Sequence, residues 1–269
     1  MRVIRRMVPG IGDAVMLEPT IRAVANTCHH YAVQTKYPQL FEGMYPLVDQ
    51  PPEGADVIDL GEDCPAARYE SAAWPIEKSR TQLFLEEAGF FYAHQSPSLD
   101  LSPQEKEVSA EYQQTLGCQI GLATISAKYN NHLDGWRDYP YPDKLAQLLS
   151  RIGTVVWFDL QPLNSKWAED FRGGLRQMMV RISSLSVMVA VDTALVHLAG
   201  ALSIPQFCLF GPTNPQYRVA QYPNVNWLPK YEKCGRAYCW YQPCEGRYCL
   251  QTISPKQIYE RVKMVLNIW

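Results

Sequence analysis

The chain has 269 residues, of which 47% are hydrophobic and 19% charged, enough for a sizeable core and two domains of ordinary size. Its formal net charge of −2 excludes the basic footprint of a nucleic-acid-binding protein, so no nucleic-acid partner is expected. The N-terminus leads into a strand-like segment without the apolar run of a signal peptide, which predicts a cytoplasmic protein with at most peripheral membrane contact.

The first half of the chain alternates short apolar runs with helical patterns. We predict strands at 3–8, 31–35 and 56–60, a turn at 11–13, and helices at 14–26 and 79–88. Residues 95–105 are rich in Ser and Pro, which makes them the best linker candidate. This half therefore reads as a short βαβ domain.

The second half continues the alternation. We predict helices at 103–116, 193–202 and 256–268, the last opened by Pro255, and strands at 120–125, 155–158, 187–191 and 206–210. Residues 187–205 are nearly long enough to span a bilayer, but Asp192 and His197 inside them favour a globular strand and helix. Strands that alternate with helices predict an α/β protein with parallel sheets.

Residues 190–213 concentrate chemical groups at two adjacent strand ends. Asp192 and Thr193 follow the strand at 187–191, where open α/β sheets place their ligands, and His197 lies about one turn into the next helix. Gly211 and Thr213 end the following strand. Strand ends and a helix N-terminus that converge predict a diphosphate site. The alternative is an ordinary βαβ unit with a histidine buried in its core.

Several motifs resemble one known family. The pattern D-T-x-x-x-H-L-A-x-A-L-x-x-P followed by L-F-G-P-T, over 192–213, is similar to the signature of glycosyltransferase family nine, the heptosyltransferase family. Pro9-Gly10-Ile11-Gly12-Asp13 and the helix after it resemble that family's N-terminal motif, residues 79–102 a third segment and 120–149 a weaker fourth. Together these segments span most of the chain in the family's order.

The resemblance implies a GT-B fold, two Rossmann-like domains that face each other across a cleft. We expect a shortened acceptor-side domain at 1–102 and a nucleotide-sugar domain at 103–269, with the helix 256–268 crossing back onto the first domain. By resemblance the enzyme is an inverting transferase without a catalytic metal or other catalytic cofactor. The resemblance implies that it moves a sugar, heptose in this family, from an ADP-sugar to a hydroxyl of an acceptor. The acceptor would be a lipopolysaccharide core, another glycan or a glycolipid.

Asp13 is the candidate general base by this resemblance, and its structural alternative is the N-cap of helix 14–26. Ala194 stands where the family usually has glycine, and no lysine directly precedes Trp136. Lys128 and Arg137 are therefore the candidate cations for the diphosphate. The full set of predicted substrate-binding residues is Gly12, Ser126, Lys128, Trp136, Arg137, Asp192, Thr193, Ala194, His197, Gly211 and Thr213.

Four of the eight cysteines recur with four residues in every gap, namely Cys234, Cys239, Cys244 and Cys249. In a cytoplasmic chain, clustered thiols favour a metal over disulfides, and four thiolates suit structural zinc or iron. The alternative is a cysteine-rich loop with free thiols or a disulfide.

Two other functions stay open from the sequence. One is a transferase that uses another nucleotide sugar and an acceptor unrelated to lipopolysaccharide, because the acceptor-side domain is short. The other is a non-catalytic nucleotide-sugar-binding protein, because Ala194 and the absent lysine depart from the family pattern.

Overall fold

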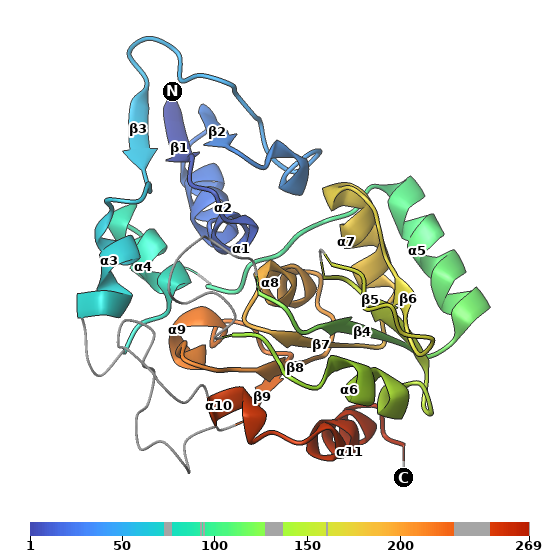
Figure 1. Cartoon of the computed structure of the whole chain (residues 1–269). Helices are drawn as coiled ribbons and strands as arrows, with labels where there is room; N and C mark the ends of the chain where they lie inside the picture. The colour runs from blue at the N-terminus through green and yellow to red at the C-terminus, as the bar shows by residue number, and fades with distance from the viewer. Residues whose placement is uncertain are drawn as a thin grey trace.

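The structure is a computed structural model, and it describes residues 1–72, 77–91, 93, 95–126, 137–159, 161–228 and 248–268. Within them the strands form two sheets, a small one near the N-terminus and a larger one below it in Figure 1. The small sheet has the order β2-β1-β3, with β1 (Arg2–Arg6) between β2 (Tyr31–Thr35) and β3 (Asp56–Asp59). All its strands are parallel, as predicted.

The larger sheet has the order β6-β5-β4-β7-β8-β9 and is also parallel. Its strands are β4 (Gln119–Ala123), β5 (Thr154–Trp157), β6 (Glu169–Asp170), β7 (Val187–Val191), β8 (Gln206–Leu209) and β9 (Val225–Trp227). The chain builds outward from β4 to β6 and then returns to add β7 on the other side of β4. The loops after β4 and β7 therefore diverge, which opens a crevice at the carboxyl ends of these two strands.

Helices connect the strands in both halves. Those of the N-terminal half are α1 (Ile11–Met16), α2 (Glu18–Thr27), η1 (Pro38–Leu40), α3 (Pro65–Ala72) and α4 (Arg80–Glu87). Those of the C-terminal half are α5 (Pro103–Leu116), α6 (Pro142–Leu149), α7 (Leu175–Ser183), α8 (Ala194–Ala201), α9 (Pro215–Arg218), α10 (Tyr248–Gln251) and α11 (Pro255–Val265). None of the described helices is long and apolar enough to cross a membrane.

The predicted helix 14–26 is in fact two helices, α1 and α2, which meet at Leu17. Pro19 explains the break, because it lacks an N–H and its ring would clash with the carbonyl of Val15 in a continuous helix. It fits instead in the first turn of α2. Helix α1 begins at Ile11 with Gly10 as N-cap, so the prediction that Asp13 lies in a turn before the helix, as a possible N-cap, is wrong.

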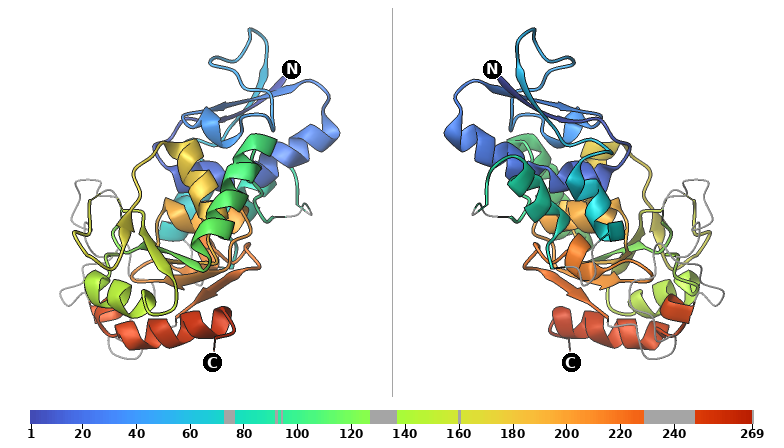
Figure 2. Two further views of the ribbon diagram at one scale, coloured as in Figure 1. Left: turned by 90° about the vertical axis from the view of Figure 1, so that its right-hand side faces the viewer. Right: turned by 90° about the vertical axis from the view of Figure 1, so that its left-hand side faces the viewer.

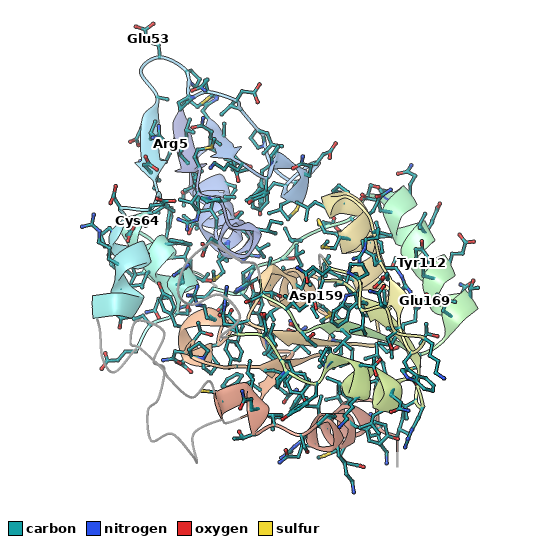
Figure 3. All side chains as sticks on the ribbon, in the orientation of Figure 1. Arg5, Glu53, Cys64, Tyr112, Asp159 and Glu169 are labelled. Atoms are coloured by element: carbon teal, nitrogen blue, oxygen red, sulfur yellow. The ribbon has the colours of Figure 1, made fainter. Side chains whose placement is uncertain are left out.

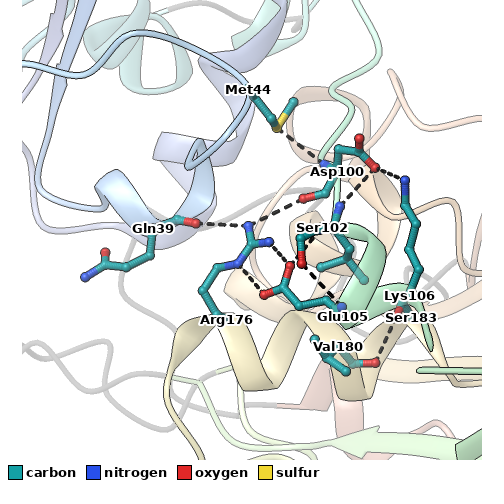
Figure 4. Close-up of polar contacts among 10 residues, drawn as sticks. Gln39, Met44, Asp100, Ser102, Glu105, Lys106, Arg176, Val180 and Ser183 are labelled. Carbon is teal, nitrogen blue, oxygen red and sulfur yellow. Dashed lines mark hydrogen bonds and ion pairs between the residues drawn. The ribbon is translucent and has the colours of Figure 1, made fainter. Parts of the chain in front are cut away.

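The linker between the halves is tightly held. The Leu99 N–H donates to the Ala201 carbonyl at 3.0 Å, and both Leu99 and Leu101 are buried. Arg176 of α7 adds a clamp, shown in Figure 4: it pairs with the Glu105 carboxylate and donates to the Gln39 carbonyl at 3.2 Å. One guanidinium thus joins η1 of the N-terminal half to α5 and α7 of the other.

One continuous apolar cluster occupies the space between the two sheets. It contains Ile4 and Val15 from the N-terminal half together with Met188, Leu195 and Leu198 from the C-terminal half. The two halves therefore share a core. The predicted domain boundary between residues 102 and 103 stays a prediction. It separates the strands of the two sheets, but the apolar core continues across it.

A second apolar cluster lies on the other face of the larger sheet, under α6 and α11. Ile258 and Val262 of α11 are fully buried there. In Figures 1 and 2 this helix lies on the side of the larger sheet away from the small sheet. The expected crossing of the last helix onto the first domain is therefore wrong for its described residues, because the apolar face of α11 is covered by α6 and β8 of its own half.

Candidate active site

A cavity of about 110 Å³ lies where α1 and α8 meet, each following the carboxyl end of a strand. It brings together seven of the predicted site residues from both halves. Its lining is Gly10, Ile11, Gly12, Asp13, Met16, Arg137, Asp192, Thr193, Ala194, His197 and Arg218. The sequence did not single out Arg218, which lies at the end of α9.

Gly12 allows the two helices to touch. A Cβ atom at this position would lie 2.6 Å from His197 Cδ2 and 3.5 Å from the Ala194 Cα. Real Cβ contacts essentially never come below 3.0 Å, so any side chain at residue 12 would push α1 away from α8. The glycine is thus required by the close approach of two helices from different halves.

We expect Gly12→Ala to lower turnover by about 10-fold to 100-fold, because displacement of α1 by a few tenths of an ångström moves Asp13 relative to Asp192. The overpacked interface should also lower the free energy of unfolding by about 1–3 kcal/mol. Steady-state kinetics and urea unfolding measure the two effects. Gly89→Ala is not a suitable control, because the φ of Gly89 is +87° and any side chain there is strained. Ala14→Gly, two residues further along α1, tests whether a loosened α1 alone is enough to lower turnover.

Asp13 lies in the first turn of α1 between two arginines. Its Oδ2 is 3.4 Å from Arg6 Nη2, and its Oδ1 pairs with Arg80 Nη1. Both arginines are buried, and each also covers an aromatic ring, Arg6 that of Phe84 and Arg80 that of Tyr217. The two guanidinium groups fix the position of the carboxylate.

Burial alone would raise the pKa of Asp13, but the positive charges of Arg80, Arg6 and Arg218 outweigh it and hold that pKa well below its usual range. The carboxylate is therefore ionised near neutral pH. A base of this kind is weak in the ground state and gains its proton late in the reaction.

Asp192 follows β7 and is the second buried carboxylate of the cavity, at 3% exposed. Its Oδ2 lies 3.4 Å from Arg137 Nη1, which also donates to the Asp192 carbonyl at 3.1 Å. Burial alone would raise the pKa of Asp192, but the charges of Arg218 and Arg137, together with the Thr213 hydrogen bond, outweigh it and hold that pKa below its usual range. Two carboxylates and several arginines thus share one small space.

His197 is buried and its Nδ1 lies 3.2 Å from the Tyr222 hydroxyl. Burial is the largest effect on the pKa of His197 and, aided by the Arg218 charge, lowers it to about 4 against the opposing effect of Asp192. The ring is therefore neutral near pH 7. It packs against Gly12 and contributes to the contact of α1 with α8.

Thr193 is the N-cap of α8, and its hydroxyl accepts from the Leu195 N–H at 3.3 Å. Ala194 is the first residue of that helix. Among the described residues, the non-glycine positions with positive φ are Asn164, Ser203 and Asn267. Ala194 therefore occupies its position without the left-handed backbone that would demand glycine.

The loop after β4 is fixed by two carboxylates. The Thr124 and Ile125 N–H groups donate to Asp159 Oδ2 at 2.7 and 3.0 Å, and the Ser126 N–H donates to Asp138 Oδ1 at 2.8 Å. Burial, with Asp138 adding to it, raises the pKa of Asp159 to about 7 against the effect of the two N–H bonds. Asp159, labelled in Figure 3, follows β5 and thus supports the crevice wall.

The remaining predicted residues divide into two groups. Ser126, Gly211 and Thr213 are buried at the carboxyl ends of β4 and β8, close to the cavity but not in its lining. Lys128, Trp136, Cys234, Cys239 and Cys244 lie outside the described residues. Cys249 is described, and it is buried in α10. No group of three candidate metal ligands occurs within the described part of the chain.

The sequence of the chain is similar to those of known glycosyltransferases. Residues 172–249 match the family model of glycosyltransferase family 9 (heptosyltransferase). The chain is 39% identical over 109 residues to lipopolysaccharide heptosyltransferase 1 of Pseudomonas aeruginosa, an alignment that covers 35% of this chain and 31% of that protein. It is 30% identical over 98 residues to lipopolysaccharide heptosyltransferase 2 of Salmonella typhimurium, covering 30% and 28%. The matched part thus spans about a third of these relatives, and the resemblance inferred from the motifs is confirmed.

Solved structures resemble the chain over nearly its whole length. A glycosyltransferase family 9 protein from Veillonella parvula has a TM-score of 0.70 at 16% identity and covers 99% of this chain and 97% of its own. The E. coli ADP-heptose heptosyltransferase II has a TM-score of 0.62 at 15% identity, covering 99% of each. TibC of E. coli, described as an iron-containing dodecameric glycosyltransferase, has a TM-score of 0.68 at 14% identity and covers 99% and 76%. These likenesses confirm the predicted GT-B fold.

Proposed function

We propose that this chain is a glycosyltransferase of the heptosyltransferase type. It transfers a sugar, heptose by resemblance, with inversion from an ADP-sugar to a hydroxyl of a glycan or glycolipid acceptor. The observation that carries the proposal is the meeting of Asp13 from the N-terminal half with Asp192 from the C-terminal half at one arginine-rich cavity. Such a site at the switch point of a parallel sheet is where α/β proteins bind nucleotides.

The chemistry is a single displacement. Asp13 takes the proton of the acceptor hydroxyl, whose oxygen forms a bond to the anomeric carbon while the bond from that carbon to the diphosphate oxygen breaks. The electron pair of the broken bond leaves with the nucleoside diphosphate. Asp13 belongs to the N-terminal half and the cations Arg137 and Arg218 to the C-terminal half. If the acceptor oxygen attacks from the side opposite the diphosphate, the configuration of the anomeric carbon is inverted.

The cations of the site suit the departing diphosphate. Arg137 and Arg218 belong to the C-terminal half and surround Asp192, where they stand in for the lysine that the sequence lacks before Trp136. Four arginines act on the two carboxylates, namely Arg6, Arg80, Arg137 and Arg218. The excess of positive charge stabilises negative charge that builds up on the leaving group.

A second cavity provides the space that a nucleotide sugar needs. It has a volume of about 620 Å³ and shares Ile11 with the smaller one. Lys36 and Tyr37 of the N-terminal half and the start of α7 line it. Drug-sized ligands occupy about 300–1,000 Å³, so we assign the reacting centre to the small cavity and the bulk of the substrates to the larger one.

A thermal-shift panel of nucleotides and nucleotide sugars tests the proposal. A ligand at 100 times its Kd stabilises the native state by about 2.7 kcal/mol, so ADP-sugars should raise Tm more than UDP-, GDP- or CMP-sugars. Stabilisation by a different nucleotide sugar would favour the alternative transferase. Binding without turnover on any glycan acceptor, followed by mass spectrometry, would favour the non-catalytic alternative. No stabilisation by any nucleotide contradicts the proposal.

We also propose that Cys234, Cys239, Cys244 and Cys249 hold one structural zinc or iron. The buried thiol of Cys249, at the end of this segment, fits a ligand that is shielded from solvent, and four thiolates would leave no open position for catalysis. The iron-containing description of TibC is consistent with such a site.

Purified protein should contain about one zinc or iron per chain by elemental analysis, because four thiolates complete a tetrahedral site. Cys249→Ser should abolish the bound metal and lower Tm, since metal binding contributes to folding. Cys118→Ser, a partly exposed cysteine at the start of β4, is the matched control and should keep both. Metal-free protein with four titratable thiols in this segment would contradict the site.

A further inference from the structure

Tyr217 connects the C-terminal half to the ion pair of Asp13. It belongs to α9, directly after the Gly211 to Thr213 turn, and its side chain is fully buried. Its hydroxyl donates to the Ala66 carbonyl at 2.6 Å and accepts from Arg80 Nε at 2.9 Å. Both partners belong to the N-terminal half, so the hydroxyl joins the two halves beside the cavity.

The aromatic ring of Tyr217 also holds the guanidinium. The Arg80 Cζ lies 4.9 Å from the ring centroid, and the Tyr69 ring stacks on the Tyr217 ring at 6.2 Å. Arg80 uses Nε for the tyrosine and Nη1 for Asp13, so its planar group is fixed at two points. The hydroxyl can donate only once, and because it donates to Ala66, its lone pair faces Arg80.

We propose that Tyr217 is a positioning residue for the transfer reaction: it sets Arg80 against Asp13 and thereby aligns the base with the donor half. This inference rests on the proposed function. Its physical reason is that the base and the donor are carried by different halves, and a misplacement of about 1 Å costs roughly 100-fold in rate. Tyr217 belongs to the donor half and holds Arg80, the partner of the base Asp13. It therefore keeps the base and the donor in a fixed relative position.

The test is a double-mutant cycle on kcat. Tyr217→Phe keeps the ring and removes only the hydroxyl, and we expect kcat to fall about 10-fold while the donor Kd, measured by calorimetry, stays within about 2-fold. Arg80→Gln should lower kcat at least as much. In the Arg80→Gln background, Tyr217→Phe should change kcat by less than about 2-fold, because the tyrosine acts through the arginine.

Tyr139→Phe is the matched control. Tyr139 is also buried, and its hydroxyl donates to the Ile253 carbonyl at 2.9 Å on the side of α11. The variant loses the same kind of hydrogen bond to a backbone carbonyl, at a position away from the Arg80 and Asp13 pair. We expect a similar loss of stability in urea unfolding and an unchanged kcat.

Full turnover in Tyr217→Phe, or an equal fall of kcat in both the wild-type and the Arg80→Gln backgrounds, would overturn the inference. A fall of kcat in Tyr139→Phe equal to that in Tyr217→Phe would show a general effect of stability and overturn it too. Failure of the proposed function is seen separately and earlier, as wild-type protein that turns over no donor and acceptor pair.

Discussion

Asp13→Asn is expected to lower kcat by roughly 100-fold to 10,000-fold, the usual contribution of a positioned general base. The amide has nearly the same volume and cannot accept the proton of the acceptor hydroxyl. The donor Kd should persist, because Arg137 and Arg218, the cations assigned to the diphosphate, belong to the C-terminal half. Since the pKa of Asp13 is held well below its usual range, this group should also cause no fall of wild-type kcat between pH 8 and pH 5.

Asp13→Asn should also lower the free energy of unfolding. If Asp13 were only an N-cap, the substitution would leave this free energy nearly unchanged. Asparagine is a good cap, but Gly10 is the N-cap here and Asp13 pairs with Arg6 and Arg80. With the Asp13 side chain 24% exposed, we expect a loss of about 2–4 kcal/mol, somewhat less than for a fully buried pair.

Glu18→Gln is the matched control for that stability loss. Its carboxylate is buried and pairs with Arg22, and neither of these residues lines the small or the larger cavity. Urea unfolding should show comparable losses in the two variants, whereas only Asp13→Asn should lose turnover. Near-normal kcat in Asp13→Asn, or an equal loss of kcat in both variants, would contradict the role of Asp13 as base.

The second large effect is expected from Asp192→Asn, and it should depend on the ligand. If Asp192 accepts from the sugar hydroxyls, the variant should bind an ADP-sugar about 30-fold to 1,000-fold more weakly, in keeping with a loss of 2–4 kcal/mol for a buried charged contact. Free ADP should bind as well as to the wild type or more tightly, because Arg137 and Arg218 lose an opposing negative charge.

Calorimetric titration with ADP and with the ADP-sugar, at one ionic strength, separates these outcomes. Arg137→Gln is the companion variant and should weaken both ligands, since it removes a cation from the same site. Equal weakening of ADP and ADP-sugar by Asp192→Asn would show that this carboxylate organises the pocket without contacting the sugar.

Local patterns predicted most of the elements of the fold. The bounds of β2, β7 and α5 agree with the predicted ranges, because the signals for them lie in neighbouring residues. These signals are the apolar runs of the strands and the capping box of Ser102 and Glu105 at the start of α5. Helices α6 and α7 were not predicted, although both helices are amphipathic. The expected crossing of α11 onto the first domain came from the family resemblance. The apolar face of α11 itself, which packs on α6 and β8, was not used to place this helix.

Of the site, the sequence predicted the residues next to recognisable turns and missed their partners. Asp13 and Asp192 follow strand ends, which are visible in the chain. Arg6 is one of several arginines in β1, and Arg80 is the first residue of α4, directly after its N-cap Ser79. No sequence pattern around either arginine indicates that it pairs with Asp13. Only the folded structure brings Arg6 of β1 and Arg80 of α4 to the same carboxylate.

The apolar cluster shared by the two sheets has a thermodynamic consequence. Two domains that open as rigid lobes need an interface that separates at little cost, but here separation would expose side chains such as Val15, Leu195 and Leu198 to water. The halves should therefore melt as a single cooperative unit, and neither should be stable when expressed alone. If the proposed function holds, we expect substrates to enter and leave through movements of individual loops and helix ends, and the exchange rate to depend on local opening and not on a hinge between the halves.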